Sequence, residues 1–308
     1  MALLRHTTSG VQRMLETEHL VGRSPRAPLR LDSSYVSAQH ASIRWTADGW
    51  ELRDLGSRNG TWVDGNALKS GETIRLQRGC KVSFGHADQT WELIDDSPPQ
   101  AQVVRLDGEG EPLLVEVNML ALPSADDPQV TILRMPDGSW KIEREDAMVP
   151  LVSEQVFEVG GKAFRFCAPG VMSGTSALEE PELTQAVHDL RLEFLVSRDE
   201  EHVQIFVGRG PEKIDLGSRA YHYLLLLLAR HRLADATQGI ADSACGWMYQ
   251  EDLLDALRIG ADRLNVDIFR IRKRFAALGI HDAAHIIERR PDSRQLRIGV
   301  ATCLIQSL

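Results

Sequence analysis

Short segments in which apolar and polar residues alternate dominate the first 95 residues of the chain. The stretches 41–45 and 50–53 are examples, and turns rich in Gly, Asp and Asn separate such segments. Alternation with a period of two places one set of side chains on each face of a strand, so one face can be buried while the other meets water. We therefore predict an all-β sandwich over residues 1–95.

A second β-rich stretch follows at 103–167. Its segment 130–143 has apolar alternation, an Asp-Gly turn and then a tryptophan, and the segment 43–52 has the same three features. This similarity leaves two interpretations open: a degenerate second sandwich, or a small β-extension of the first. The segments 96–100 and 168–181 contain Pro, Ser and Gly at high density and are expected to be linkers.

Beyond residue 191 the pattern changes to a mixture of strand and helix periodicity. The five-leucine run Leu224–Leu228 is apolar on every face and far shorter than a membrane span, which indicates a buried helix. The predicted elements, in chain order, are strands at 192–196 and 202–207, helices at 221–232, 251–257 and 264–278, and a closing strand pair at 286–290 and 295–298. We therefore predict a multidomain protein: an all-β sandwich at 1–95, a β-rich extension with its linkers at 96–182, and an α+β domain at 183–308.

The composition excludes several classes of protein. No apolar run approaches the roughly 18 residues that a membrane-spanning helix needs, and the polar Thr7, Thr8 and Ser9 interrupt any signal-peptide core. We expect a cytoplasmic protein that does not contact a membrane. The four cysteines lie far apart, so we predict neither a metal site nor a redox pair and expect reduced, buried thiols.

The sequence carries no signature of an enzyme active site. A glycine-rich phosphate loop with its lysine, a nucleophile elbow, a His-Glu-x-x-His motif and the kinase motifs are all missing from it. The ten histidines are scattered along the chain. We therefore predict that the protein is not an enzyme and needs no cofactor.

Three short motifs stand in order in the predicted sandwich: Gly22-Arg23, the segment 37–40 and the segment 54–65. Together with 71–76 and 82–85 they resemble the motif set of the forkhead-associated (FHA) family, and the resemblance covers nearly the whole predicted sandwich. It implies an all-β domain that binds phosphothreonine in other proteins. A fixed guanidinium with hydroxyl and amide donors beside it suits a doubly charged phosphate.

The same resemblance assigns roles to individual residues. Arg23 is implied to pair with the phosphate, and Ser37 to donate its hydroxyl from the neighbouring loop. Asn59 is implied to grip the peptide backbone, while Arg58 is either a further peptide contact or an ordinary surface residue. The residues implied to be structural are Gly22, His40 and Gly60. Ala38 stands where the family often has a basic residue, so we expect a modest affinity.

The C-terminal elements resemble a second family. Residues 264–275 are similar to the recognition helix of OmpR-type response-regulator effector domains, 247–257 to the helix before it, and 287–297 to the wing. The resemblance implies a winged helix-turn-helix, in which a cationic helix enters the major groove of double-stranded DNA and the wing contacts phosphates. The implied contacts are Arg263, Arg270, Arg272 and Lys273 on the helix, with Val266, Ile268, Ile271 and Phe275 turned inward, and Arg289, Arg290 and Arg294 on the wing.

The charge distribution favours DNA binding only in this last region. The chain has a formal net charge of -9, and the excess of acidic residues lies before residue 183. The segment 263–297 holds nine Lys and Arg residues against four Asp and Glu residues, a local excess of five positive charges. Asp262 and Asp267 lie among the implied contacts and would repel phosphates, so a solvated charged helix face is the alternative explanation.

Two functions fit these features. In the first, the chain is a signalling protein in transcription regulation: the FHA domain binds a threonine-phosphorylated protein, such as a Ser/Thr kinase or its substrate, and the winged helix binds DNA. In the alternative, the chain is a phosphorylation-dependent adaptor whose winged helix binds protein. Affinity for DNA falls steeply with salt, which distinguishes the two.

Overall fold

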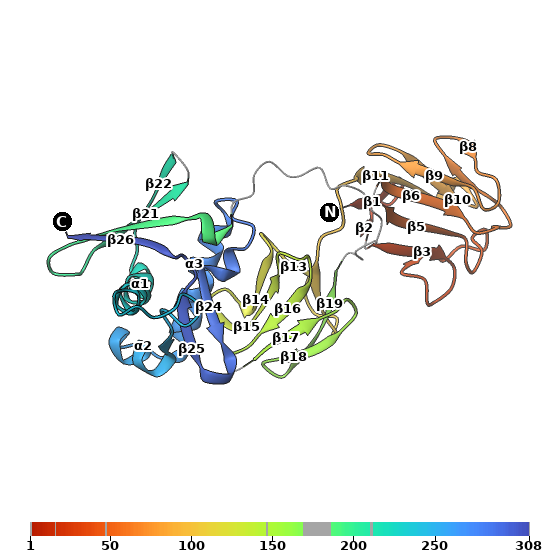
Figure 1. The fold of residues 1–308 in the computed structure, drawn as a ribbon. Helices are drawn as coiled ribbons and strands as arrows, with labels where there is room; N and C mark the ends of the chain where they lie inside the picture. The colour runs from red at the N-terminus through yellow and green to blue at the C-terminus, as the bar shows by residue number, and fades with distance from the viewer. Residues whose placement is uncertain are drawn as a thin grey trace.

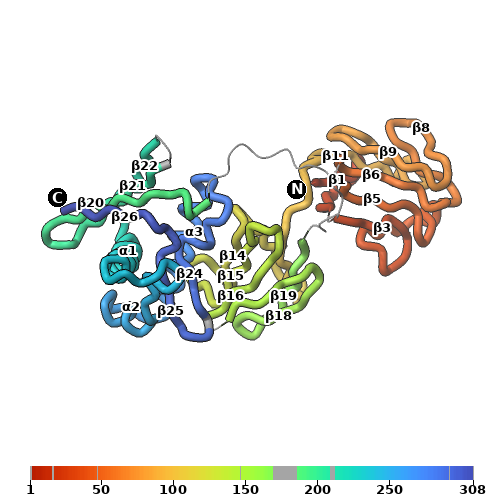
Figure 2. Tube along the Cα trace, in the orientation of Figure 1, coloured from red at the N-terminus to blue at the C-terminus, as the bar shows by residue number. Residues whose placement is uncertain are grey.

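The computed structural model describes residues 2–15, 17–46, 48–145, 147–168, 186–209 and 212–307. They form an N-terminal sandwich, a middle sandwich and a C-terminal unit of helices and sheets, and the middle sandwich lies between the other two (Figures 1 and 2). None of the helices in these ranges is long and apolar enough to cross a membrane. The predicted linker 168–181 lies outside the described residues, apart from Ala168.

Two sheets make up the N-terminal sandwich, in the orders β2-β1-β11-β10-β7-β8 and β4-β3-β5-β6-β9. The strands are β1 (Leu3–His6), β2 (Gln12–Met14), β3 (Glu18–Gly22), β4 (Leu29–Arg30), β5 (Ala41–Thr46), β6 (Gly49–Asp54), β7 (Thr61–Val63), β8 (Asn66–Ala67), β9 (Thr73–Leu76), β10 (Lys81–Phe84) and β11 (Thr90–Asp95). Alternate residues of these strands, such as Ile43 and Leu52, fill one core between the sheets. The predicted all-β sandwich is confirmed.

The middle stretch also forms two sheets, in the orders β13-β12-β19-β18 and β14-β15-β16-β17. The strands are β12 (Gln102–Arg105), β13 (Leu113–Leu114), β14 (Met119–Ser124), β15 (Asp127–Arg134), β16 (Trp140–Glu143), β17 (Met148–Leu151), β18 (Val156–Val159) and β19 (Lys162–Cys167). Buried residues from both sheets, including Val103, Ile132 and Phe166, form a core separate from the first. The middle stretch is therefore a sandwich of its own rather than an extension of the first.

The C-terminal unit holds three α-helices and two small sheets within the described residues. Its elements are β20 (Arg191–Val196), β21 (Val203–Arg209), β22 (Glu212–Ser218), α1 (His222–Thr237), β23 (Met248–Tyr249), α2 (Gln250–Leu257), α3 (Ala261–Ala276), β24 (Ile287–Arg290), β25 (Gln295–Ile298) and β26 (Thr302–Ser307). Single-turn 3-10 helices occur here and in the first sandwich at Ala87–Gln89, Val187–Asp189, Ala283–Ile286 and Pro291–Ser293. Strands β22, β23 and β26 were not predicted from the sequence.

Helix α1 is buried along most of its length, as its leucine run predicts. Leu224, Leu225, Leu226 and Leu228 are all essentially inaccessible to solvent. They lie between the sheet of β20, β21, β22 and β26 on one side and α2, α3 and the β24–β25 pair on the other, so each face of the helix meets apolar neighbours. Helix α3 follows and packs against β15 of the middle sandwich.

The middle sandwich and the C-terminal unit share one hydrophobic core. Met119, Ala121 and Leu133, on the outer face of β14 and β15, belong to the cluster that contains Ile268 and Ile271 of α3. The side chains of Leu133 and Ile271 are each about 1% exposed. This shared core joins residues that are far apart in the sequence into one packed body.

A buried ion pair crosses the same boundary. The Arg272 guanidinium lies 2.5 Å from the Glu143 carboxylate and donates a second hydrogen bond of 2.6 Å to the backbone oxygen of Ile287. The two charged side chains are only 2% and 5% exposed. Burial opposes ionisation of Glu143, but the positive charges of Arg272 and Arg289 hold its pKa below the ordinary value.

We predict that Glu143→Ala lowers the free energy of unfolding by about 3–5 kcal/mol, because Arg272 is left buried without its partner. The matched control is Glu92→Ala, which removes an ion pair with Arg5 whose side chains are 26% and 45% exposed. That change should cost less than about 1 kcal/mol. Urea unfolding followed by circular dichroism measures both, and equal losses in the two variants would contradict the prediction.

Candidate functional site

Three loops meet at one end of the N-terminal sandwich. Arg23 directly follows β3, Ser37 lies between β4 and β5, and Arg58 and Asn59 lie between β6 and β7. The backbone N–H of Arg23 donates to the oxygen of Ser37 at 2.9 Å, and the N–H of Arg58 donates to the Ser37 hydroxyl at 3.1 Å. The structure therefore brings all four predicted ligand contacts together.

Glycine at position 22 permits the first two loops to touch. A Cβ atom on Gly22 would lie 2.2 Å from the backbone oxygen of Ala38, which no side chain tolerates. A hydrogen bond of 3.1 Å from the Ser24 N–H to that same oxygen stabilises this close contact between the loops. Gly60 has a φ of +83°, a conformation that glycine adopts without strain, and it turns the chain from the third loop into β7.

His40 lies inside the site, fully shielded from solvent. Its Nδ1 accepts a hydrogen bond of 3.1 Å from the Ser37 N–H, so Nε2 carries the proton and donates to the oxygen of Gly60 at 3.0 Å. Burial lowers the pKa of His40, although the bond to Gly60 and the charge of Asp54 act in the opposite direction. A neutral imidazole thus links the second loop to the third.

Asp54, which the sequence analysis did not single out, holds the third loop in place. One carboxylate oxygen accepts from the N–H groups of Gly56 and Ser57 at 2.8 and 3.1 Å. The other accepts from the hydroxyls of Ser57 and Thr61 at 2.6 and 2.7 Å. Burial opposes ionisation, but these four hydrogen bonds hold the pKa of Asp54 below its ordinary value of 3.8. The Asp-x-Gly-Ser pattern was the available signal, since it is typical of such a side-chain-capped turn.

The surface of the three loops is cationic and has free hydrogen-bonding groups. The side chains of Arg23 and Arg58 are exposed, and neither guanidinium bonds to any residue in the described part of the chain. The Asn59 amide donates one hydrogen bond of 2.8 Å to the oxygen of Tyr35, which leaves its second N–H and its oxygen available. Such a group of donors can bind an anion and a neighbouring peptide backbone.

An exposed aromatic pair borders this surface. The ring of Tyr35 stacks on that of His86, with ring centroids 4.7 Å apart and an angle of 21° between the planes. Tyr35 is 52% exposed. Neither residue could be predicted from the sequence, because nothing in it indicates that the segment before β5 and the turn after β10 lie side by side. No cluster of His, Cys, Asp and Glu suited to a metal ion occurs among the described residues.

The predicted DNA contacts on α3 all have partners inside the protein. Arg263 pairs with Asp267 at 3.1 Å, Arg270 with Asp126 at 2.8 Å and Lys273 with Glu116 at 3.3 Å. Arg272 was expected on the solvent side of the helix, and that expectation was wrong: its side chain is 2% exposed and bound to Glu143. The physical reason is that the middle sandwich covers this face of α3.

The predicted contacts on the β24–β25 pair are also mostly occupied. Arg289 is 7% exposed at its side chain and donates to the Asn265 side-chain oxygen at 2.6 Å. Arg290 lies over the ring of Trp247, 3.9 Å from its centroid, and donates to the oxygen of Ser243 at 3.0 Å. Arg294 is exposed, and within the described residues its guanidinium has no partner.

Comparison with known proteins identifies the N-terminal region. Residues 19–85 match the family model of the FHA domain. Protein FraH of Nostoc sp. is 34% identical over 80 residues, which is 24% of this chain and 28% of FraH. The FHA domain-containing protein FhaB of Mycobacterium tuberculosis is 35% identical over 66 residues, which is 21% of this chain and 41% of FhaB.

The oxoglutarate dehydrogenase inhibitor of Corynebacterium jeikeium is 32% identical over 82 residues, which is 25% of this chain and 57% of that protein. Each match thus spans less than two thirds of the relative. The solved structure of Mycobacterium tuberculosis EmbR in complex with a low-affinity phosphopeptide matches with a TM-score of 0.29 and 26% identity, over 32% of this chain and 25% of EmbR. The family match and the fold agree that residues 19–85 of the N-terminal sandwich form an FHA domain.

Proposed function

We propose that this protein is a phosphothreonine-dependent signalling protein whose FHA domain binds a threonine-phosphorylated partner through Arg23, Ser37, Arg58 and Asn59. FHA domains are phosphothreonine-binding modules of signalling proteins. The observation that carries the residue assignment is the meeting of three loops around two arginines that lack partners in the described part of the chain. A phosphate dianion would supply the missing acceptor oxygens.

Each group in the site has a distinct role in this proposal. The Arg23 guanidinium pairs with the phosphate, and the Ser37 hydroxyl, which already accepts from the Arg58 N–H, donates its own hydrogen to a phosphate oxygen. The free N–H and oxygen of Asn59 face the peptide backbone. Arg58 adds positive charge at the rim. EmbR, which was solved with a phosphopeptide, offers a parallel for this kind of ligand.

Arg23→Ala should weaken binding of phosphothreonine peptides at least about tenfold, because a charge-assisted hydrogen bond contributes about 1.5–3 kcal/mol. The probe is a degenerate phosphothreonine peptide library, with the unphosphorylated library as reference, measured by fluorescence anisotropy. Arg78→Ala is the matched control, since Arg78 is exposed in the turn between β9 and β10, at the opposite end of β10 from the loops. If Arg23→Ala bound the phosphothreonine peptides with wild-type affinity, the proposed role of Arg23 in binding the phosphate would be contradicted.

Asp54→Asn should destabilise the FHA domain by about 1–3 kcal/mol at neutral pH, because an amide cannot accept all four of the hydrogen bonds that the carboxylate accepts. The pKa of Asp54 is depressed on folding, so its contribution is present above the unfolded value of 3.8 and is lost as the pH falls through the folded value. The difference between wild type and variant in urea unfolding should therefore shrink below pH 3.8. A difference that stays constant to lower pH would contradict this role.

For residues 183–308 we propose, as the first candidate, a winged helix that binds DNA. The order α1, β23, α2, α3 and then the β24–β25 pair favours it, as does the positive charge of the segment 263–297. The alternative is a phosphorylation-dependent adaptor whose C-terminal unit contacts protein only. The ion pairs of α3 with the middle sandwich favour this alternative for the conformation described.

Retention of duplex DNA over a salt series separates these two candidates. If the C-terminal unit binds DNA, full-length protein should retain fragments weakly at low salt, and the logarithm of the affinity should fall linearly with the logarithm of salt concentration. Addition of a threonine-phosphorylated protein, in place of a short peptide, tests whether the two ends of the chain are coupled. An adaptor would show no salt-dependent retention at any concentration.

A further inference from the structure

The middle sandwich repeats the strand order of the FHA sandwich. Its first sheet, β13-β12-β19-β18, matches the FHA strands β2-β1-β11-β10, and its second, β14-β15-β16-β17, matches β3-β5-β6-β9. Every one of these pairings is antiparallel in both sandwiches, and the matched strands follow the same order along the chain. The segments 43–52 and 130–143, which are similar in sequence, lie on the matched pairs β5–β6 and β15–β16. The middle sandwich therefore has the core of the FHA fold.

What the second sandwich lacks is the ligand-binding end. In the FHA sandwich, strand β3 connects to β5 through β4 and through the loops that carry Arg23 and Ser37. In the middle sandwich, β14 ends at Ser124 and β15 begins at Asp127, so only two residues connect them. The connection after β16 is likewise short and contains no counterpart of β7 and β8. The described residues of this copy thus include no equivalents of the loops that carry Arg23, Ser37 and Asn59 in the FHA sandwich.

One position on the outer face of the second sheet differs in charge and burial between the two sandwiches. Ser42 pairs with Arg53 next to the pair of Ile43 and Leu52, and Thr131 pairs with Glu143 next to the pair of Ile132 and Ile142. Glu143 thus stands at the position of Arg53. Arg53 is exposed on the FHA sandwich, whereas Glu143 is buried beneath α3. This position thus carries an exposed arginine in the first sandwich and a buried glutamate in the second.

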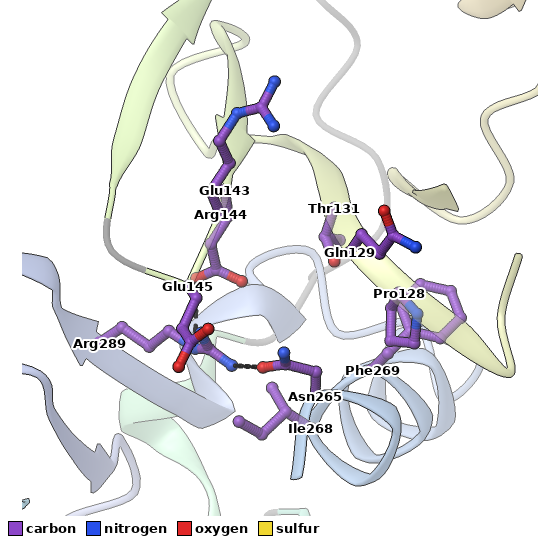
Figure 3. Close-up of a pocket in the computed structure, with 10 residues that line it drawn as sticks. All are labelled: Pro128, Gln129, Thr131, Glu143, Arg144, Glu145, Asn265, Ile268, Phe269 and Arg289. Atoms are coloured by element: carbon purple, nitrogen blue, oxygen red, sulfur yellow. Dashed lines mark hydrogen bonds and ion pairs between the residues drawn. The ribbon is translucent and has the colours of Figure 1, made fainter. Parts of the chain in front are cut away.

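The middle sandwich supplies a carboxylate for each of three cations on α3, one from the covered face, one from the β14–β15 turn and one from the segment before β14. Glu143 takes Arg272, Asp126 takes Arg270 and Glu116 takes Lys273. Figure 3 shows the cavity at this boundary: Glu143 and Glu145 come from the middle sandwich, and Arg289 reaches toward Asn265 of α3. Glu116, Asp126 and Glu143 thus pair with the positive groups of α3 that DNA phosphates would otherwise contact.

The contact is tight but not fully satisfied. The Nε atoms of Arg272 and Arg289 are buried and have no hydrogen-bond partner among the described residues. A buried unsatisfied donor costs about 1–3 kcal/mol. These two donors therefore offset part of the stabilisation that the covered state gains from burial.

We propose that the middle sandwich is a copy of the FHA fold that has lost its phosphate site and now acts as an intramolecular inhibitor, covering the DNA-binding face of helix α3. This inference rests on the proposal that the C-terminal unit binds DNA. In the closed state the cations of α3 are held by Glu116, Asp126 and Glu143, and only the open fraction of molecules binds DNA. The apparent affinity is then the intrinsic affinity reduced by that fraction.

Leu133 offers a way to open the contact without damaging the sandwich. Its side chain points to the outer face and belongs to the core shared with α3, whereas its neighbour Ile132 belongs to the internal core of the middle sandwich. Leu133→Lys places a positive charge against Arg272 and removes apolar contact with the C-terminal unit. Val156→Lys is the matched control, because it adds the same charge at a position of the same sandwich that is 52% exposed.

The test measures binding of the full-length proteins to a 30-base-pair random-sequence duplex at low salt. Leu133→Lys should bind at least about tenfold more tightly than wild type, if the closed state is favoured by about ten to one or more. Val156→Lys should differ little from wild type. Adding Arg270→Glu and Lys273→Glu to Leu133→Lys should abolish the gain, and hydrogen exchange of α3 reports whether the helix is uncovered.

A second variant, at exposed positions, tests the same proposal in case Leu133→Lys does not fold. Glu116→Gln with Asp126→Asn changes two side chains that are 69% and 84% exposed, so the fold should persist. Freeing Lys273 and Arg270 in this way should raise DNA affinity about threefold, in keeping with the small energies of exposed ion pairs. Glu154→Gln with Glu158→Gln makes the same change in net charge on β18 and the turn before it, and should have no such effect.

The outcomes are separable from those of the FHA proposal. Phosphothreonine-peptide binding, measured in parallel, should be unchanged in every variant, because the peptide loops lie on the first sandwich. Equal DNA affinity in wild type, in the uncovered variants and in their controls overturns the inhibitor. If none of these proteins binds DNA while peptide binding persists, both the inhibitor and the DNA proposal fail and the phosphothreonine proposal stands.

Discussion

The buried ion pair between Glu143 and Arg272 fixes how the middle sandwich and the C-terminal unit fit together. A charge removed from water must meet its partner in good geometry, so this pair favours the observed position of α3 over other packed positions that would leave either charge buried and unpaired. Once α3 is placed, Arg270 and Lys273 lie within reach of Asp126 and Glu116. Apolar contact supplies most of the attraction, whereas the ion pair determines the register. The covering of the cationic helix face follows from that register.

The two sandwiches share one fold, but their polar and charged side chains have different partners. In the FHA domain, buried polar side chains support the loops: His40 and Asp54 are buried, and their hydrogen bonds hold the loops in place. Because backbone and buried groups do the bracing, the guanidinium groups of Arg23 and Arg58 take no part in it among the described residues. At the corresponding end, the middle sandwich has a two-residue connection between β14 and β15 and, among its described residues, no equivalent of His40 and Asp54. Three of its carboxylates, on Glu116, Asp126 and Glu143, pair with cations of α3.

The sequence predicted best those features that depend on local geometry. Motifs such as Gly22-Arg23 work because a close backbone approach needs glycine, and that need is visible in the sequence. The burial of Arg272 depends on what packs against α3, which periodicity does not reveal. A partial signal existed, since Arg272 follows Ile268 by four residues and precedes Phe275 by three, and so lies on the apolar stripe. Strand β26 was missed because its partner β20 is more than a hundred residues away.

The arrangement also limits how a phosphorylated partner could act on the C-terminal unit. A ligand shifts a conformational equilibrium only by the difference in its affinity for the two states. A short phosphothreonine peptide held by the loops of the first sandwich would meet the same groups whether α3 is covered or not. The linker is held to the FHA domain at one point, because the Trp50 side chain donates a hydrogen bond of 3.1 Å to the backbone oxygen of Ser97. Coupling would therefore require a whole phosphoprotein that extends from the FHA loops to the middle sandwich and competes there for the cations of α3 or for the carboxylates that hold them.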